Sequence, residues 1–153
     1  IRIDGAPKTP WIDAAASAYG GRKSNAAILG RIVRRIRQPA AFATLNLDGQ
    51  DAAWGFAVAE RGWVGLYDIV VSPDLRGLGL GRRLVEGLME WGRRQGATRA
   101  YLQVREVNEV ARTLYGSIGF RPVYRYTHRV RPDSAAPVER LETGEPEHVG
   151  KRR

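Results

Sequence analysis

The feature that most constrains the fold is an apolar strand that leads through a glycine-rich turn into a helix and a second strand. Residues 63–71, WVGLYDIVV, are apolar almost throughout, which is typical of a buried central strand. Residues 80–94 repeat leucine at helical spacing, and residues 99–104, RAYLQV, alternate as a strand does. A strand–helix–strand crossover within one sheet joins parallel strands. The sequence therefore predicts a sheet that contains a parallel pair.

The segments around this unit predict antiparallel strands and further helices. Apolar runs over residues 40–60 flank Asp48-Gly49, a pair that favours a two-residue hairpin turn. Helices are predicted over 11–19 and 24–39, and RPVYRYTHRV, residues 121–130, is predicted as a closing strand. The expected fold class is α+β, with a mixed, mostly antiparallel, twisted sheet flanked by helices.

The glycine-rich turn, RGLGLG, has the composition of an anion-binding loop. Three glycines at alternate positions, Gly77, Gly79 and Gly81, let the backbone turn sharply with its N–H groups on one side. A helix that begins near Gly79 adds its unpaired N–H groups and its positive dipole end, so a diphosphate is a natural ligand. The spacing fits neither the dinucleotide fingerprint nor the nucleotide-triphosphate loop. A glycine-rich turn that binds nothing is the competing interpretation.

Composition narrows the function classes. The 153 residues carry 25 Lys and Arg against 16 Asp and Glu, a formal net charge of +9. This charge indicates either a solvated surface or a positive field that attracts an anionic ligand. A nucleic-acid binder is the third reading, but no zinc-finger or RNA-binding motif supports it. The chain has no cysteine, and His128 and His148 are isolated, so no metal site is predicted.

The span from residue 40 to 130 resembles the GNAT superfamily of acyl-CoA-dependent N-acetyltransferases. The family signature is Arg or Gln, two residues, Gly, one residue, and Gly or Ala, followed by a helix, a strand and a second helix. The closest pattern within the family is that of bacterial ribosomal-protein alanine N-acetyltransferases. The matching positions here are Arg76, Gly79 and Gly81, then Val104 with Asn108, then Leu114-Tyr115 with Gly119-Phe120.

The resemblance implies acetyl-CoA as co-substrate and transfer of its acetyl group to a primary amine of a small molecule or protein. In this family the loop amides hold the coenzyme pyrophosphate, and the strand before the loop pairs with the pantetheine arm. Asn108 is also a good helix N-cap, and the two roles are compatible. The residues expected to bind the cofactor are Ile69, Val70, Val71, Arg76, Gly77, Leu78, Gly79, Leu80, Gly81, Arg82, Asn108 and Tyr115.

The same resemblance proposes Tyr115 as the general acid that protonates the leaving thiolate; packing against the sheet is the alternative role. The related alanine acetyltransferases use a glutamate base where this chain has Gln103, which cannot accept a proton. Asp68 is the best replacement, and strand alternation would place it on the same face as Val70. A hydrogen-bonded structural carboxylate is the alternative for Asp68, and Glu60, Glu106 or a water chain are weaker candidates for the base.

Residues 1–131 are expected to form one N-acetyltransferase domain, which can be the C-terminal part of a longer chain, and residues 132–153 a polar tail. No apolar run is long enough to cross a bilayer, and a cytoplasmic location is expected. The alternative function is a non-catalytic acyl-CoA-binding lobe of a larger two-lobed protein. The amine acceptor and the oligomeric state stay open.

Overall fold

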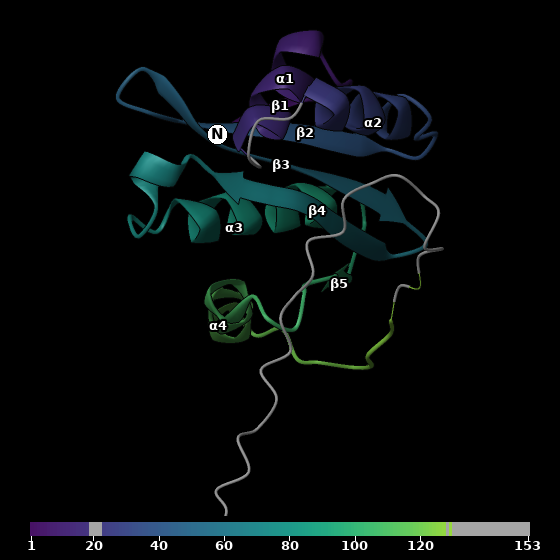
Figure 1. Ribbon diagram of the computed structural model, residues 1–153. Coiled ribbons are helices and arrows are strands. Elements are labelled where there is room, and N and C mark those ends of the chain that lie inside the picture. The colour runs from purple at the N-terminus through teal and green to yellow at the C-terminus, as the bar shows by residue number, and fades with distance from the viewer. Residues whose placement is uncertain (19–22, 128, 130–153) are drawn as a thin grey trace, which may run out of the picture. The chain divides into compact units, whose positions relative to one another are not determined.

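A five-stranded sheet lies at the centre of the computed structural model, which describes residues 1–18, 23–127 and 129. The strands follow one another in chain order across the sheet (Figure 1). The first four pair antiparallel, and only the last pair is parallel, as the crossover in the sequence predicts. The strands are β1 (Arg2–Asp4), β2 (Ala40–Leu47), β3 (Gln50–Glu60), β4 (Trp63–Val71) and β5 (Arg99–Leu102).

Two tight turns set the antiparallel register. Asp48 and Gly49, between β2 and β3, have φ of 51° and 89°. Arg61 and Gly62, between β3 and β4, have φ of 51° and 79°. Positive φ at both central residues is the requirement of a two-residue hairpin whose twist matches its strands. The hairpin predicted at Asp48-Gly49 is therefore confirmed.

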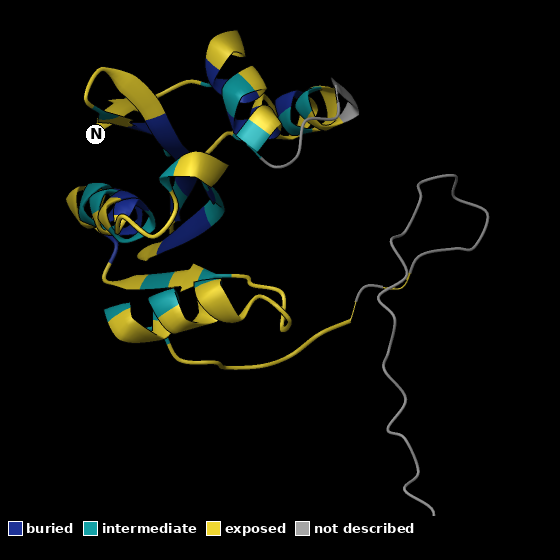
Figure 2. Ribbon diagram, turned by 60° about the vertical axis from the view of Figure 1, so that its left-hand side comes forward, coloured by how far each residue is buried: buried dark blue, intermediate teal, exposed yellow. Residues whose placement is uncertain are grey.

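Helices cover both faces of the sheet (Figure 1). The helices α1 (Thr9–Ala18) and α2 (Lys23–Val33) pack on one face, where Trp11, Phe42 and Phe56 are buried. The helix α3 (Leu80–Arg94) packs on the other face through its fully buried Leu84 and Leu88. Each such leucine contributes roughly 1.5–3 kcal/mol by leaving water. Figure 2 shows this interior as the dark blue faces of the strands and helices.

The helix predicted over residues 80–94 is confirmed, and the helix that follows β5 ends, like it, at a glycine. The helix α3 is followed by Gly96, whose φ is 84°, and α4 (Glu109–Ile118) ends at Gly119, whose φ is 109°. Left-handed glycines at these positions are the usual end of a helix. The helix predicted over 24–39 is shorter than expected, because α2 ends at Val33. Arg35 and Ile36 donate to the carbonyls three residues earlier, so the chain tightens and leaves the helix before Pro39.

One strand was missed in the sequence, and two strand predictions need correction. The strand β1 was not predicted, since its three residues carry too short a pattern to recognise. The strand predicted over 99–104 ends at Leu102. The closing strand predicted over 121–130 is wrong for residues 121–127, which form no regular structure; Val123 there is 89% exposed. A strand needs a neighbour that accepts its hydrogen bonds, and a local apolar pattern does not show whether one is present.

All the elements above belong to one compact unit, Ile1–Arg121, and the chain from Pro122 belongs to a separate unit. Within that second unit, the rings of Tyr124 and Tyr126 contact each other at 6.2 Å. The tail predicted for 132–153, like His128 and His148, lies outside the described residues. Among the described helices, none has the length and apolar character needed to span a membrane.

Candidate coenzyme and acceptor site

The strands β4 and β5 pair only as far as Leu66 and Leu102, and we call the point where this pairing stops the fork. Their parallel ladder runs from Trp63, opposite Arg99, to Leu66, opposite Leu102. Beyond this point β5 has ended, while β4 continues to Val71 and stays paired with β3. The edge of β4 from Tyr67 to Val71 therefore turns toward a space that β5 does not fill.

A bulge makes the backbone of β4 irregular just beyond the fork. Phe56 pairs with Tyr67 and Trp54 with Val70, so one residue of β3 faces two residues of β4, Asp68 and Ile69. Asp68 has a φ of 48°, the left-handed conformation that glycine usually supplies at the first position of a bulge. The prediction that Asp68 shares a face with Val70 assumed regular alternation, which the bulge interrupts at these residues. Leu66 and Ile69 pack on the α3 side, and Tyr67 and Val70 pack on the opposite side.

The glycine loop follows β4 directly and opens the helix α3. Pro73–Leu75 form a short 3-10 turn, and Gly77 and Gly79 then adopt φ of 82° and 74°. A side chain at either glycine would meet no atom within 4 Å, so the loop surface is open there. Within the described chain, no backbone N–H from residue 77 to 82 donates to a protein carbonyl; the first helical bond is that of Arg83 to Gly79. These N–H groups are therefore available to an anion.

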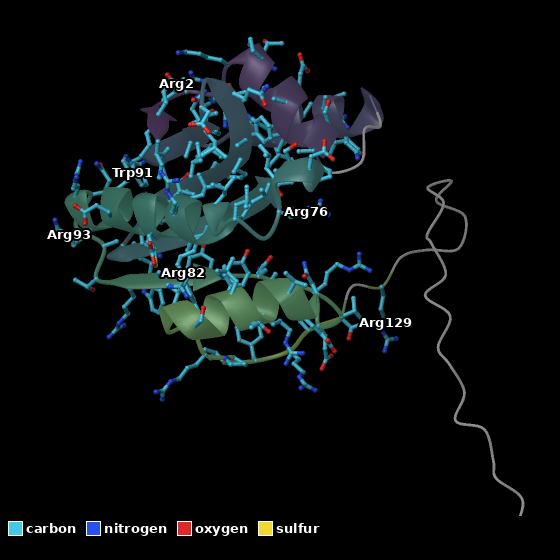
Figure 3. All side chains as sticks on the ribbon, turned by 90° about the vertical axis from the view of Figure 1, so that its left-hand side faces the viewer. Arg2, Arg76, Arg82, Trp91, Arg93 and Arg129 are labelled. Carbon is cyan, nitrogen blue, oxygen red and sulfur yellow. The ribbon has the colours of Figure 1, made fainter. Side chains whose placement is uncertain are left out.

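Two arginines near the loop make contacts of their own. The Nε of Arg76 lies 3.4 Å from the carbonyl oxygen of Val71, which holds this side chain across the end of β4. The guanidinium of Arg82 donates to Ser117 at 2.5 Å and to Glu86 at 3.2 Å. Figure 3 shows Arg76 beside the loop and Arg82 between α3 and α4. In this structure Arg82 therefore links two helices rather than pointing toward the loop amides.

The helix α4 completes the site. The Oδ1 of Asn108 accepts a hydrogen bond of 3.1 Å from the N–H of Ala111, which confirms its N-cap role. Leu114 and Val71 both approach Gly81, where an added Cβ would lie 3.3 Å and 3.7 Å from their side chains. The end of β4, the start of α3 and the middle of α4 thus meet at Gly81.

Tyr115 follows Leu114 on α4. Its ring packs edge-to-face on Phe120 with centroids 6.1 Å apart, and it borders the core on the α3 side. Burial raises the pKa of the Tyr115 hydroxyl above its ordinary value of 10.0. The hydroxyl therefore keeps its proton at neutral pH, as a general acid must.

An aromatic pocket of about 470 Å³ lies on the opposite face of the sheet. Phe56 stacks on Tyr67 at 5.0 Å, and the hydroxyls of Tyr67 and Tyr101 hydrogen-bond across β4 and β5 at 2.5 Å. These rings lie over Gly65, where a Cβ would approach the Tyr67 hydroxyl to 2.5 Å. Burial and the Tyr101 hydrogen bond raise the pKa of Tyr67. The pocket is lined by Ile32, Ile36, Gln38, Phe56, Val58, Glu60, Arg61, Trp63, Tyr67 and Tyr101.

The sequence also offers aromatic residues as candidates for an acceptor pocket, although packing in the core or at a sheet edge is their more common role. These candidates are Trp54, Trp63, Tyr67, Tyr124 and Tyr126. Trp54 is buried in the core at 7% exposure, and the two later tyrosines belong to the separate unit. Tyr101 was missed. Its signal was present, because Trp63, Tyr67 and Tyr101 are the large aromatic side chains of two strands predicted to be neighbours.

The GNAT class of acyltransferase folds is defined by three features seen here. They are the forked mixed sheet, the open glycine loop at the start of α3, and the helix α4. The chain belongs to the family described as "Probable histone acetyltransferase Rv0428c C-terminal", whose model matches residues 1–131. The resemblance found in the sequence, and the α+β fold it implied, are thereby confirmed.

Two relatives show what kind of proteins are similar in sequence. The uncharacterized N-acetyltransferase YobR of Bacillus subtilis is 31% identical over 125 residues, which is 82% of this chain and 51% of that protein. The [ribosomal protein bS18]-alanine N-acetyltransferase of Escherichia coli is 36% identical over 76 residues, 50% of this chain and 51% of that protein. The chain thus spans about half the length of these relatives.

Solved structures agree on the fold. The structure of AAC(6')-Iy, in complex with the bisubstrate analog CoA-S-monomethyl-acetylneamine, has a TM-score of 0.65 at 18% identity. It covers 85% of this chain and 97% of that chain. The ribosomal-protein-S18-alanine N-acetyltransferase from Escherichia coli has a TM-score of 0.63 at 23% identity, covering 80% of this chain and 79% of that chain. At these identities the likeness concerns the fold.

Proposed function

We propose that this domain transfers an acetyl group from acetyl-CoA to a primary amine. The proposal is carried by one observation: the fork in the sheet leads directly into a glycine loop whose backbone amides are unpaired within the described chain. The family match over residues 1–131 supports the same function and supports these residues as the catalytic domain. No finding favours the alternative of a non-catalytic lobe.

The loop would hold the coenzyme diphosphate through backbone N–H groups. Six consecutive residues, 77–82, offer N–H groups that no protein carbonyl accepts within the described chain, and the dipole of α3 points its positive end at them. Gly77 and Gly79 leave room for phosphate oxygens to approach the backbone. Arg76 adds positive charge at the same end of β4.

The pantetheine arm would lie along β4 in the fork. Ile69, Val70 and Val71 lie past the last residue of β4 that pairs with β5, so their backbone groups on that side can pair with an amide-bearing chain. Asn108 uses its Oδ1 as a cap, and its side-chain NH2 keeps two donors for a ligand. Acetyl-CoA supplies the thioester carbonyl and its leaving thiolate.

Tyr115 would donate its proton to the departing sulfur. Its raised pKa keeps the hydroxyl protonated, and the preceding residue on α4, Leu114, lies with Val71 around Gly81. Asp68 would remove one proton from the incoming ammonium, because an amine attacks only when its lone pair is free. The nitrogen would then bond to the thioester carbon as the C–S bond breaks, and the second proton that it loses balances the one that Tyr115 gives to the sulfur. The bulge supports this choice, since Asp68 lies in the fork in a backbone conformation that the fold maintains against strain.

Replacement of Gly79 by glutamate tests the diphosphate site. The substitution brings a carboxylate to the proposed phosphate position, and we expect affinity for acetyl-CoA to fall by about tenfold or more through like-charge repulsion and lost access. Calorimetric titration with acetyl-CoA measures it. Gly96→Glu is the matched control, because Gly96 also has positive φ, 84° against 74°, and also has no atom within 4 Å of an added Cβ. Equal affinity in the two folded variants would contradict the loop assignment.

A further inference from the structure

The aromatic pocket is continuous with a line of rings that crosses the sheet. Trp11 contacts Phe42 at 5.2 Å, Phe42 stacks on Phe56 at 5.7 Å, and Phe56 stacks on Tyr67. Tyr67 then contacts Tyr101, which contacts Trp63, each at 6.2 Å. The line is buried at its Trp11 end and opens to solvent where the pocket lies.

The open end leaves large apolar side chains uncovered. Ile32 is 56% exposed, Tyr101 is 41% exposed and Trp63 is 40% exposed, and all three line the same pocket. Phe56 forms its floor at 5% exposure. This largely apolar lining offers a place for an apolar group of another molecule. The volume of about 470 Å³ falls in the range of small-molecule sites.

The pocket reaches the fork. Its lining on β4 runs from Trp63, at the start of the strand, to Tyr67, which is the first residue of β4 beyond the parallel ladder. Tyr67 is also the residue directly before Asp68 in the bulge. The lining of the pocket therefore ends at the first residue of the fork, next to Asp68 in the chain.

The charges around the pocket do not suit a polycation. Glu60 is the only carboxylate among the described residues that line it, and its Oε1 lies 3.7 Å from the Nε of Arg61, another lining residue. Arg99 lies over the ring of Trp63 at 5.3 Å and adds a second positive charge at the rim. The local balance is thus neutral to positive, and a molecule with several ammonium groups gains no counter-charge here.

We propose that this pocket selects the acceptor, and that the acceptor is a primary amine carried next to an aromatic or branched aliphatic group. The inference rests on the proposed acetyl transfer and adds the substrate class. The apolar group packs among Ile32, Phe56 and Trp63, and the amine lies toward Tyr67 at the start of the fork. Such an amine can belong to a free arylalkylamine or to the first residue of a peptide.

Coenzyme release with a panel of acceptors tests the substrate class. The panel contains phenethylamine and tryptamine, a peptide beginning with Phe and one beginning with Ala, and the polycations spermidine and neomycin. We expect kcat/KM for the aromatic amines to exceed that of the polycations by about tenfold or more, since apolar packing discriminates on that scale. Activity on the Phe peptide alone assigns the peptide source, and activity on the free amines assigns the small-molecule source. Preference for spermidine or neomycin would overturn the inference and leave acetyl transfer standing.

A matched pair of variants on one helix locates the pocket. Ile32→Glu brings a charge into the lining, whereas Ile28→Glu makes the same change one turn earlier at a side chain that is 48% exposed and does not line the pocket. We expect kcat/KM for the aromatic amines to fall about tenfold in Ile32→Glu. It should change less than about twofold in Ile28→Glu, with unchanged acetyl-CoA affinity in both. Equal effects in the two variants would contradict the pocket.

Calorimetry with phenethylamine separates the two proposals. If phenethylamine binds the parent and Ile28→Glu but not Ile32→Glu, the result supports the pocket. If no amine is acetylated in the same experiments, the proposed function alone is contradicted. Acetylation without a difference between the variants would contradict the pocket alone. If phenethylamine does not bind and no amine is acetylated, both proposals are contradicted.

Discussion

Tyr115 illustrates how packing and a proposed chemical role can combine in one residue. Its ring contacts Phe120 and the core, and the same burial that stabilises this position raises the pKa of the hydroxyl. Packing and the acid role were alternatives in the sequence, but the structure makes them compatible. Gln103, by contrast, cannot serve as a base, and it lies beyond the end of β5 at an exposed position.

Tyr115→Phe tests the acid role. Loss of the proton donor should lower kcat by about 10- to 100-fold while acetyl-CoA affinity stays within about twofold, because the ring is kept. Since the pKa of Tyr115 is raised above 10.0, its acid form persists as pH rises, and kcat of the parent should not decline up to about pH 9 on its account. Tyr124→Phe, a change at an exposed tyrosine of the separate unit, is the control. Unaltered kcat in Tyr115→Phe, with chemistry rate-limiting, would refute the role.

At the scale of elements, β4 does the most to shape the site. It pairs with β3 along its length, with β5 only up to Leu66, and carries the bulge at Asp68. The bulge turns the face of every residue after it, so Ile69 and Val71 pack toward α3 and Val70 toward α1. One inserted residue thereby decides which side chains border the coenzyme face and which border the acceptor face.

Asp68→Gly separates the structural from the catalytic role of this carboxylate. Glycine adopts positive φ without strain, so the bulge should persist and the free energy of unfolding should stay within about 1 kcal/mol of the parent. Turnover should fall about 100-fold if Asp68 is the base. Chemical denaturation and steady-state kinetics measure the two effects. A stable variant with parental turnover would remove Asp68 from the mechanism, and Glu60→Gln and Glu106→Gln provide the comparison.

Features that depend on residues close together in the sequence could be predicted, and features that depend on distant partners could not. The turns at Asp48-Gly49 and Arg61-Gly62 and the helices α3 and α4 depend on signals within a few residues, and the sequence shows them. The bulge depends on how β3 and β4 pair, and the end of α2 depends on competition with the turn that follows. Neither could be predicted from nearby residues alone. The failed strand over 121–127 depended on a partner that a local pattern cannot reveal.

At the scale of the whole unit Ile1–Arg121, the two proposed tasks fall on opposite faces of the sheet. The glycine loop, α3 and α4 lie on the face proposed for the coenzyme, and the aromatic pocket lies on the face covered by α1 and α2. The fork begins where the pairing of β4 and β5 stops, and our proposals have the coenzyme and the acceptor meet there. The candidate site therefore follows from topology, while the choice of acceptor follows from the side chains that line one pocket.

The central claim is that the backbone amides of the glycine loop bind the diphosphate of coenzyme A, and ¹H–¹⁵N spectra recorded during a coenzyme A titration test it most directly. The amide signals of Gly77, Gly79 and Gly81 should shift strongly at saturation, because their N–H groups gain charged acceptors. Those of Gly96 and Gly119, at the far ends of α3 and α4, should stay in place. Saturating binding that leaves the three loop amides unmoved would contradict the account.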